Sequence, residues 1–210
     1  MSGPVTFYTN PMSRGQIVRW ALEESGAAYE TVIVEYGADM KAPDYLAINP
    51  MGKVPAIRHE GRVVTECAAI CAWLAEAFPE AGLAPAADER AAYYRWMFFA
   101  AGPLEQAITA HAMGWTTEED RSAMLGYGSF DDTIDAVEAL LRDNDYVCGS
   151  RFTMADVYVG SHIEWGLNFG TLPKRPVFEA YAGRIAGRAA HKRARAIDAA
   201  LIAEREAAGS

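Results

Sequence analysis

An extended backbone segment between two prolines is the first part of this sequence whose residues could do chemistry. Residues 49–55 read NPMGKVP. Pro55 has no N–H to give to a sheet, so it should stand at the start or edge of a strand, and it forces Val54 into an extended conformation. Val54 would then hold out its backbone N–H and C=O, and an extended peptide ligand could pair with them. The plainer interpretation is a proline-rich loop that enters a hairpin.

Ser13 and Asn10 follow the first predicted strand and could contact an anion. Residues 13–16 read SRGQ, a pattern that predicts a capping box at the start of a helix. A hydroxyl there lies near the positive end of the helix dipole, where an anion is favoured. Ser13 is therefore the first candidate donor, although the same hydroxyl could serve only as the helix cap. Asn10 is the second candidate, because its amide comes directly after the strand.

Glu66 and Cys67 stand where the next helix is predicted to begin. The helix dipole favours an acid at this position, which is the simplest explanation of Glu66. The backbone N–H of Cys67 could bind a carboxylate. Cys67 and Cys71 lie on one helical face, so both thiols could also be buried without a role, and the same holds for Cys148.

Composition limits the function. The chain has 210 residues, of which 51% are hydrophobic and 22% charged, and its net charge is -9. That size fits two modest domains, and an acidic protein is a poor candidate for binding nucleic acid. No apolar run reaches the ~18 residues of a membrane span, and no signal peptide is evident, so a cytoplasmic location is expected. The three cysteines form no Cys-x-x-Cys, the four histidines show no metal-ligand spacing, and no metal site is predicted.

The first part of the chain alternates strand and helix patterns. Strands are expected at 5–8, 29–34, 56–58 and 62–64, and helices at 13–26 and 66–78. A strand–helix–strand unit implies a parallel crossover, and the later hairpin around Glu60-Gly61 adds antiparallel strands. The prediction is a small mixed α/β domain at 1–81.

After a linker at 79–88 the strand patterns end. Helices are expected at 89–113, from about 116–120, and at 129–143, 153–169, 176–187 and 190–206. Gly102-Pro103 should kink the first of them, and residues 153–156, TMAD, predict a capping box. Residues 88–210 are therefore predicted to form an all-helical C-terminal domain.

Taken together, these features resemble the cytosolic-type, bacterial glutathione transferases. The matching segments are NPMS at 10–13, NPMGKVP at 49–55, TE at 65–66 and GSRFTMAD at 149–156. They run through nearly the whole chain in the family's order. The resemblance implies a thioredoxin-like N-terminal domain, with a mixed four-stranded sheet and helices, followed by an all-helical domain.

The resemblance also implies roles for these residues in binding glutathione as co-substrate, without a further cofactor. Val54 would pair with the cysteinyl backbone, before a cis Pro55, and Glu66 would accept from the γ-glutamyl ammonium. The family most often has serine where this chain has Cys67, so only its backbone N–H is expected to bind the γ-glutamyl carboxylate. Lys53, and less directly Lys41, are the candidates for the glycyl carboxylate.

The implied reaction is attack of the glutathione thiolate on an electrophilic small molecule. Ser13, or else Asn10, would donate to the sulfur and so favour the thiolate. The electrophile pocket is expected between the domains and is assigned to Met12, Phe99, Trp115, Trp165 and Phe169. The family implies a homodimer in detoxification. Two alternatives remain: a glutathione-dependent reductase or isomerase, and a non-catalytic binding protein on the same scaffold.

Overall fold

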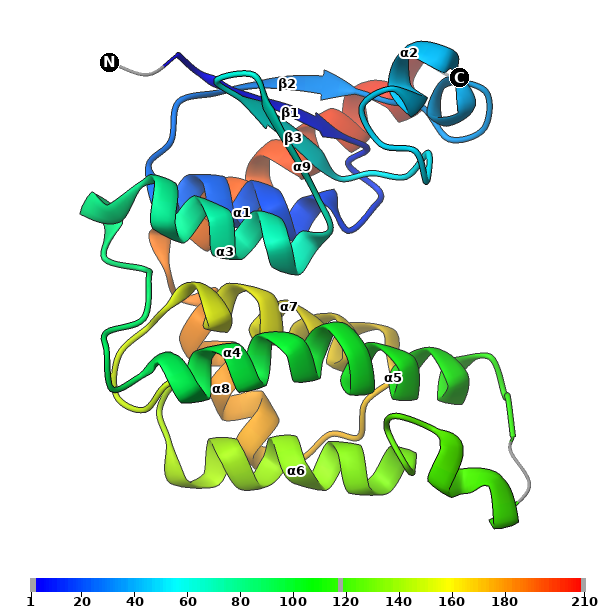
Figure 1. Ribbon diagram of the computed structural model, residues 1–210, viewed down its shortest axis with the longest axis vertical. Coiled ribbons are helices and arrows are strands. Elements are labelled where there is room, and N and C mark those ends of the chain that lie inside the picture. The colour runs from blue at the N-terminus through cyan, green and yellow to red at the C-terminus, as the bar shows by residue number, and fades with distance from the viewer. Residues whose placement is uncertain (1–2, 117–118, 209–210) are drawn as a thin grey trace. The chain divides into compact units, whose positions relative to one another are not determined.

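The computed structural model describes residues 3–116 and 119–208, and their contacts divide them into two compact units. One unit comprises the chain up to Ala84 together with Gly187 onward, and the other comprises Pro85–Ala186. Figure 1 labels most of the elements of both.

The first unit is built on a four-stranded mixed sheet. Its strands are β1 (Val5–Thr9), β2 (Tyr29–Ile33), β3 (Ala56–His59) and β4 (Arg62–Thr65). They lie in the order β2-β1-β3-β4, with β1 parallel to β2 and antiparallel to β3. β3 and β4 form the predicted hairpin, and its two turn residues, Glu60 and Gly61, have φ of 49° and 77°. Positive φ at both positions is what a tight hairpin turn between twisted strands requires.

Two helices pack together against one face of this sheet (Figure 1). They are α1 (Gly15–Ser25) and α3 (Cys67–Ala77). Each helix turns fully buried apolar residues inward, among them Val18, Leu22, Ile70 and Leu74. Between β2 and β3 lie a 3-10 turn (Asp39–Lys41) and the short α2 (Pro43–Leu46), and a further 3-10 turn (Pro79–Ala81) follows α3.

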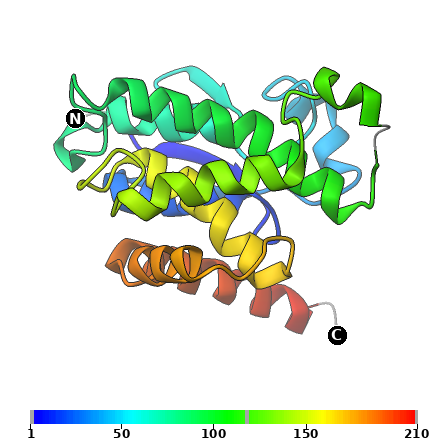
Figure 2. The same ribbon diagram turned by 90° about the horizontal axis from the view of Figure 1, so that it is seen from below.

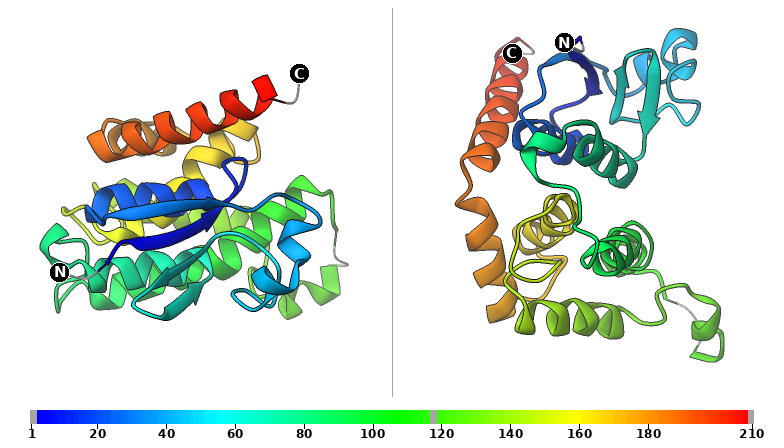
Figure 3. Two further views of the ribbon diagram at one scale, coloured as in Figure 1. Left: turned by 90° about the horizontal axis from the view of Figure 1, so that it is seen from above. Right: turned by 60° about the vertical axis from the view of Figure 1, so that its left-hand side comes forward.

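The last helix differs from the sequence expectation. α9 (Ala189–Ala208) was assigned with residues 88–210, whereas it packs along α1 and belongs to the sheet unit (Figure 3). A buried ion pair joins the two helices: Arg19 Nε donates to Asp198 Oδ1 at 2.7 Å, with side chains 1% and 3% exposed. The same guanidinium donates to Thr31 at 3.2 Å and lies 5.2 Å from the Phe7 ring centre.

The regular elements described in the second unit are all helices (Figure 2). Its helices are α4 (Arg90–Phe99), α5 (Glu105–Ala112), α6 (Phe130–Asp143), α7 (Met154–Phe169) and α8 (Pro176–Ala186). The expected interruption at Gly102-Pro103 is confirmed as a π-helical turn, Ala100–Leu104. Of the helix start expected near 116–120, residues 117–118 lie outside the described residues, and a 3-10 helix spans Glu119–Met124.

The predicted capping box opens α7. Asp156 is fully buried, and its carboxylate accepts from the backbone N–H groups of Thr153 and Val147, both at 2.8 Å. Tyr181 Oη, in α8, donates to the same carboxylate at 2.8 Å. One acid thus caps α7, holds the chain that precedes it and joins α7 to α8.

Replacing Asp156 by asparagine is expected to lower the free energy of unfolding by about 1–2 kcal/mol, because an amide accepts through one oxygen only and leaves a buried donor unpaired. Urea denaturation followed by circular dichroism measures this. The matched control is Asp143→Asn, an exposed change at the end of α6 that should alter stability by less than about 0.5 kcal/mol. Equal effects of the two changes would contradict the role given to Asp156.

Candidate functional site

The peptide bond between Val54 and Pro55 is cis, as the resemblance implied. Val54 precedes the start of β3, and its side chain is half-buried. Within the described part of the chain, neither its N–H nor its C=O has a hydrogen-bond partner. Val54 therefore presents a free strand-like backbone, which is what an extended peptide ligand pairs with.

The loop before Val54 is held by side chains that the sequence analysis did not select. Asn49 accepts from Met51 N–H at 3.1 Å and donates to the Lys53 carbonyl at 2.7 Å. Tyr45 Oη donates to the same carbonyl at 2.7 Å. Asn49 could have been found, because an asparagine that bonds the backbone two residues on is a recurrent turn. The contact of Tyr45 with the Lys53 carbonyl could not have been found from the sequence, because it depends on how the chain after α2 is folded.

Gly52 is required where the loop passes the 3-10 turn. Its φ is 57°, and a Cβ at this position would lie 2.4 Å from the Met40 carbonyl oxygen. That contact is with backbone, so a side chain here would displace the loop. Gly52 thus determines the shape of the loop before Val54.

The two candidate lysines occupy different environments. Lys41 Nζ donates to the carbonyls of Met51 and Gly52, at 2.9 and 3.2 Å, so it fastens the loop and keeps one N–H for another acceptor. Lys53 is exposed and, in the part of the chain that is described, its ammonium makes no hydrogen bond or ion pair. Lys53 is therefore the freer cation of the two.

The turn at residues 10–13 corrects one expectation. Ser13 and Gln16 do not form a capping box: α1 begins at Gly15, and Gln16 Nε2 donates to the Pro11 carbonyl at 2.7 Å. Ser13 Oγ accepts from Gly15 N–H at 2.9 Å and donates to the Asn10 carbonyl at 2.6 Å. Among the backbone hydrogen bonds of the described residues, none goes to the Pro11 carbonyl, which leaves this carbonyl available to Gln16.

Asn10 is buried in this turn, with 1% of its surface exposed. Its Oδ1 accepts from Met12 N–H at 3.0 Å, and its Nδ2 donates to the Val34 carbonyl at 3.3 Å and to Glu35 Oε2 at 3.4 Å. Both ends of the amide are therefore engaged in shaping the turn. Ser13, which is half-buried, is the more accessible of the two candidate donors.

Glu66 precedes α3 in a backbone conformation that residues other than glycine rarely adopt. Its φ is 66° and its ψ 121°, and its side chain is exposed. Strained backbone of this kind persists where the surrounding structure enforces it, and it is concentrated at functional sites. The simple explanation of Glu66 as a first-turn acid does not account for this conformation.

Cys67 joins the start of α3 to the start of α1. Its thiol is buried and donates to the Arg14 carbonyl at 3.6 Å. Ser13 and Glu66 are the chain neighbours of these two residues, so the contact brings both candidates to one place. Two helix N-termini meet there, and each favours a negatively charged ligand.

The sheet register places Val54 at the same edge. Tyr8 pairs with Ala56, so the chain that leaves β1 towards Asn10 runs beside the chain that enters β3 through Pro55. Backbone groups for an extended peptide, an acid for an ammonium and two N-termini for anions therefore surround one edge of the sheet. This combination suits a short peptide that carries carboxylates, an amine and a thiol.

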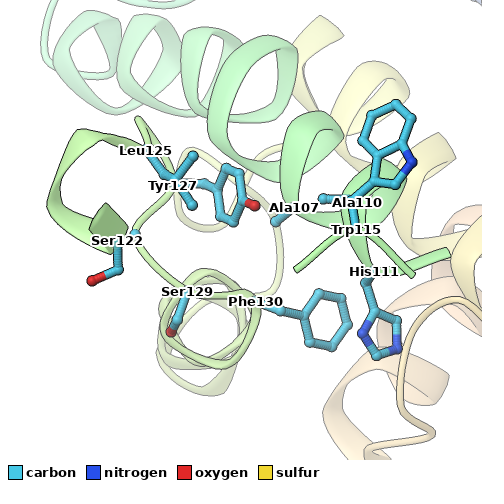
Figure 4. Close-up of a pocket in the computed structure, with 10 residues that line it drawn as sticks. Ala107, Ala110, His111, Trp115, Ser122, Leu125, Tyr127, Ser129 and Phe130 are labelled. Carbon is cyan, nitrogen blue, oxygen red and sulfur yellow. The ribbon is translucent and has the colours of Figure 1, made fainter. Parts of the chain in front are cut away.

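The residues assigned to the electrophile pocket lie in both units. Met12 is in the sheet unit and exposed, and the other four are in the helical unit. Trp115 and Phe169 are exposed, whereas Phe99 and Trp165 are half-buried. Trp115 borders a cavity of about 290 Å³ beside α5 and the start of α6, where His111 stacks on Phe130 with ring centres 4.0 Å apart (Figure 4). A pocket shared by the five residues stays a prediction.

The other two cysteines lack the character of nucleophiles. Cys71 is fully buried, and burial raises its pKa well above the usual value. Burial raises the pKa of Cys148 to about 11. Both thiols stay protonated at neutral pH, which suits inert residues. Among the described residues, no cluster of histidine, cysteine and acidic side chains could hold a metal ion. Over the same residues, no helix has the length and apolar character needed to cross a membrane.

Comparison with known proteins identifies the family. The model of the glutathione S-transferase N-terminal domain matches residues 12–77, and that of the C-terminal domain matches residues 64–165. Glutathione S-transferase GstA of Escherichia coli O157:H7 is 30% identical over 149 residues, which cover 69% of this chain and 73% of that protein. The chain belongs to the glutathione transferase family. This confirms the resemblance noted from the sequence.

Glutathione transferases of known structure share the fold. The structure of a sphingomonad glutathione S-transferase complexed with glutathione is 26% identical, with a TM-score of 0.74 over 92% of this chain and 98% of that one. The expected fold, a thioredoxin-like sheet domain and a helical part, is confirmed. A maleylacetoacetate isomerase of Pseudomonas aeruginosa is 29% identical over 167 residues, which cover 73% of this chain and 76% of that protein.

Proposed function

We propose that this protein is a glutathione transferase that binds glutathione at the sheet edge described above and activates its thiol. The observation that carries the proposal is the unpaired backbone of Val54 beside the start of α3. Glutathione is an extended peptide, so its cysteinyl N–H and C=O pair with Val54 as a strand would. The glutathione-binding domain is assigned to residues 1–81.

The charged groups of glutathione have separate partners in this proposal. Glu66 accepts from the γ-glutamyl ammonium, and the Cys67 N–H binds the γ-glutamyl carboxylate at the start of α3. Lys53 binds the glycyl carboxylate, and Lys41 uses its remaining N–H to assist. The exposed ammonium of Lys53 and the exposed carboxylate of Glu66 support these assignments.

Ser13 is the proposed donor to the sulfur. Its hydroxyl turns from the Asn10 carbonyl towards the thiolate and lowers the pKa of the bound thiol, while Asn10 keeps its amide in the turn. The thiolate then attacks the electrophilic carbon of the second substrate. A carbon–sulfur bond forms, the bond to the leaving group breaks, and the thiol proton passes to solvent.

The second substrate is a small electrophile that contacts Met12, Phe99, Trp115, Trp165 and Phe169. Their aromatic and thioether side chains suit an apolar or aromatic acceptor. The isomerase among the relatives favours a second candidate, a glutathione-dependent isomerisation at the same site. A panel of acceptors that includes conjugated dicarbonyl acids separates the two reactions.

The protein is further proposed to act in the cytoplasm as a homodimer with one site in each subunit. Support comes from membership of the glutathione transferase family, which the domain models and GstA of Escherichia coli O157:H7 show. Sedimentation equilibrium should give twice the chain mass of 22.9 kDa. A monomer at micromolar concentration would contradict the dimer.

Calorimetric titration with glutathione tests the proposed function. The protein should bind with a dissociation constant between micromolar and millimolar, and Glu66→Gln should weaken binding about tenfold, because a charge-assisted hydrogen bond is lost. Glu60→Gln, an exposed acid in the β3–β4 turn, is the matched control and should bind normally. If titration with millimolar glutathione produces no heat, the proposed binding is wrong. If glutathione binds but no acceptor in the panel gives a product, the proposed transferase reaction is wrong.

A further inference from the structure

Two series of polar contacts connect α9 to the turn that carries Ser13. In the first, Arg205 forms a two-pronged ion pair with Glu35, using both nitrogens of its fork and both carboxylate oxygens. Glu35 Oε2 in turn accepts from Asn10 Nδ2 at 3.4 Å. Asn10 then holds Ser13 directly, because its carbonyl accepts from both the hydroxyl and the N–H of Ser13, at 2.6 and 3.1 Å.

The second series reaches the same turn from the other side. Arg195 Nη1 donates to Gln16 Oε1, and Gln16 Nε2 donates to the Pro11 carbonyl at 2.7 Å. The carbonyl of Pro11 and the amide of Asn10 belong to consecutive residues. Two arginines of one helix therefore fix the orientation of the turn through two separate partners.

The helix that carries these arginines is itself firmly seated. The buried pair of Arg19 with Asp198 joins its middle to α1, and the His191 ring packs edge-on against Trp20 with ring centres 4.7 Å apart. α9 runs beside α1 in two views of the molecule (Figures 1 and 3). The position of α9 is therefore set by its contacts with α1, and not by the 10–13 turn to which its arginines are connected.

We propose that Arg205 and Arg195 are positioning residues for Ser13, acting through Glu35 with Asn10 and through Gln16 with Pro11. The inference rests on the proposed role of Ser13 as donor to the sulfur. A thiolate is stabilised only by a donor in the right direction, and the direction of the Ser13 hydroxyl depends on where Asn10 is held. The Arg205 guanidinium also holds the pKa of Glu35 below its usual value, so Glu35 is ionised and paired at neutral pH.

The test compares Arg205→Ala with Arg193→Ala. Arg193 is the matched control, because it lies on the same helix, is exposed and pairs with Glu23 of α1, away from the 10–13 turn. Arg205 is itself one-third exposed in the last turn of α9, so its removal leaves the buried core of the fold intact. Arg205→Lys keeps a single charged contact and should show an intermediate effect.

The first measurement is amide hydrogen exchange without glutathione. The N–H groups of Met12 and Ser13 donate to Asn10, at 3.0 and 3.1 Å, so they report how firmly Asn10 is held. Arg205→Ala should raise their exchange rates about fivefold, a size typical of losing one exposed ion pair, and Arg193→Ala should leave them unchanged. Equal exchange in wild type and Arg205→Ala would overturn the inference whether or not the protein is a transferase.

The second measurement is the pH profile of the conjugation rate. Arg205→Ala should lower kcat about fivefold, leave KM for glutathione unchanged and raise the apparent pKa of the bound thiol. Mere loss of folded protein would lower kcat without moving that pKa, so an unmoved pKa would overturn the positioning role. In a Ser13→Ala background the Arg205 change should have no further effect on the pKa. A further outcome is that Ser13→Ala leaves kcat and the thiol pKa unchanged while Arg205→Ala raises the exchange rate of the Met12 N–H. That result would contradict the proposed function of Ser13 and support the connection between α9 and the turn.

Discussion

Replacing Arg19 by methionine is expected to lower the free energy of unfolding by about 3–5 kcal/mol. The change leaves the Asp198 carboxylate buried without its cation, because the side chain is 3% exposed and its Oδ1 accepts from Arg19 Nε. The contact of the guanidinium with the Phe7 ring is lost as well. Urea denaturation followed by circular dichroism measures the loss.

A double variant decides whether the unpaired charge is the cause. Arg19→Met combined with Asp198→Leu should recover most of the stability. In the described structure, Arg19 Nη2 and Asp198 Oδ2 are buried without hydrogen bonds, so replacing the ion pair by two apolar side chains should cost little free energy of unfolding. Arg62→Met, which removes an exposed pair with Glu60, should change stability by less than about 0.5 kcal/mol. A double variant as unstable as the single one would show that packing volume, and not charge, is what Arg19 contributes.

The second large effect is expected from Ser13→Ala. Loss of the donor to the sulfur should lower kcat with an aryl halide acceptor about 100-fold and raise the apparent pKa of bound glutathione, since the thiolate loses its hydrogen bond. The ultraviolet absorbance of the thiolate, followed against pH in the binary complex, measures the pKa directly. KM for glutathione should change little, because Val54 and Glu66 are untouched.

Ser25→Ala is the matched control for this variant. Ser25 is a buried serine of α1 whose hydroxyl donates to the Leu22 carbonyl at 2.9 Å, away from the turn. It therefore loses a comparable internal hydrogen bond, while kcat and the thiol pKa should stay at their wild-type values. Unchanged kinetics in Ser13→Ala would assign the donor role to Asn10 instead.

Local pattern was enough to predict most helices and strands. Alternation and turn residues located the hairpin at Glu60-Gly61, and Gly102-Pro103 predicted the interruption that the structure shows as a π-helical turn. The capping box at Thr153 and Asp156 was predicted because every group in it lies within four residues. Each of these features is decided by neighbours in the chain, and so it is visible in the sequence.

Both wrong predictions concern side chains whose hydrogen-bond partners lie outside the local sequence pattern. SRGQ at 13–16 has the form of a capping box, yet Gln16 bonds Pro11 and Arg195 instead. The last helix was placed with the helical domain, because its pattern does not reveal that Asp198 pairs with Arg19. The left-handed conformation of Glu66, with φ of 66°, was not predicted from the sequence. The cis Pro55 was expected from the resemblance alone.

The position of α9 has a consequence for synthesis on the ribosome. The strands of the sheet unit end at Thr65, whereas the helix that completes this unit begins at Ala189. At the usual pace of translation, the more than 100 residues between them take on the order of 6–25 s to appear. During that interval Arg19 faces solvent without Asp198, while Pro85–Ala186 has its own core and can fold first. The strands of the sheet are therefore synthesised well before α9. Until α9 has been made, the nascent protein cannot bury the charge of Arg19 against Asp198.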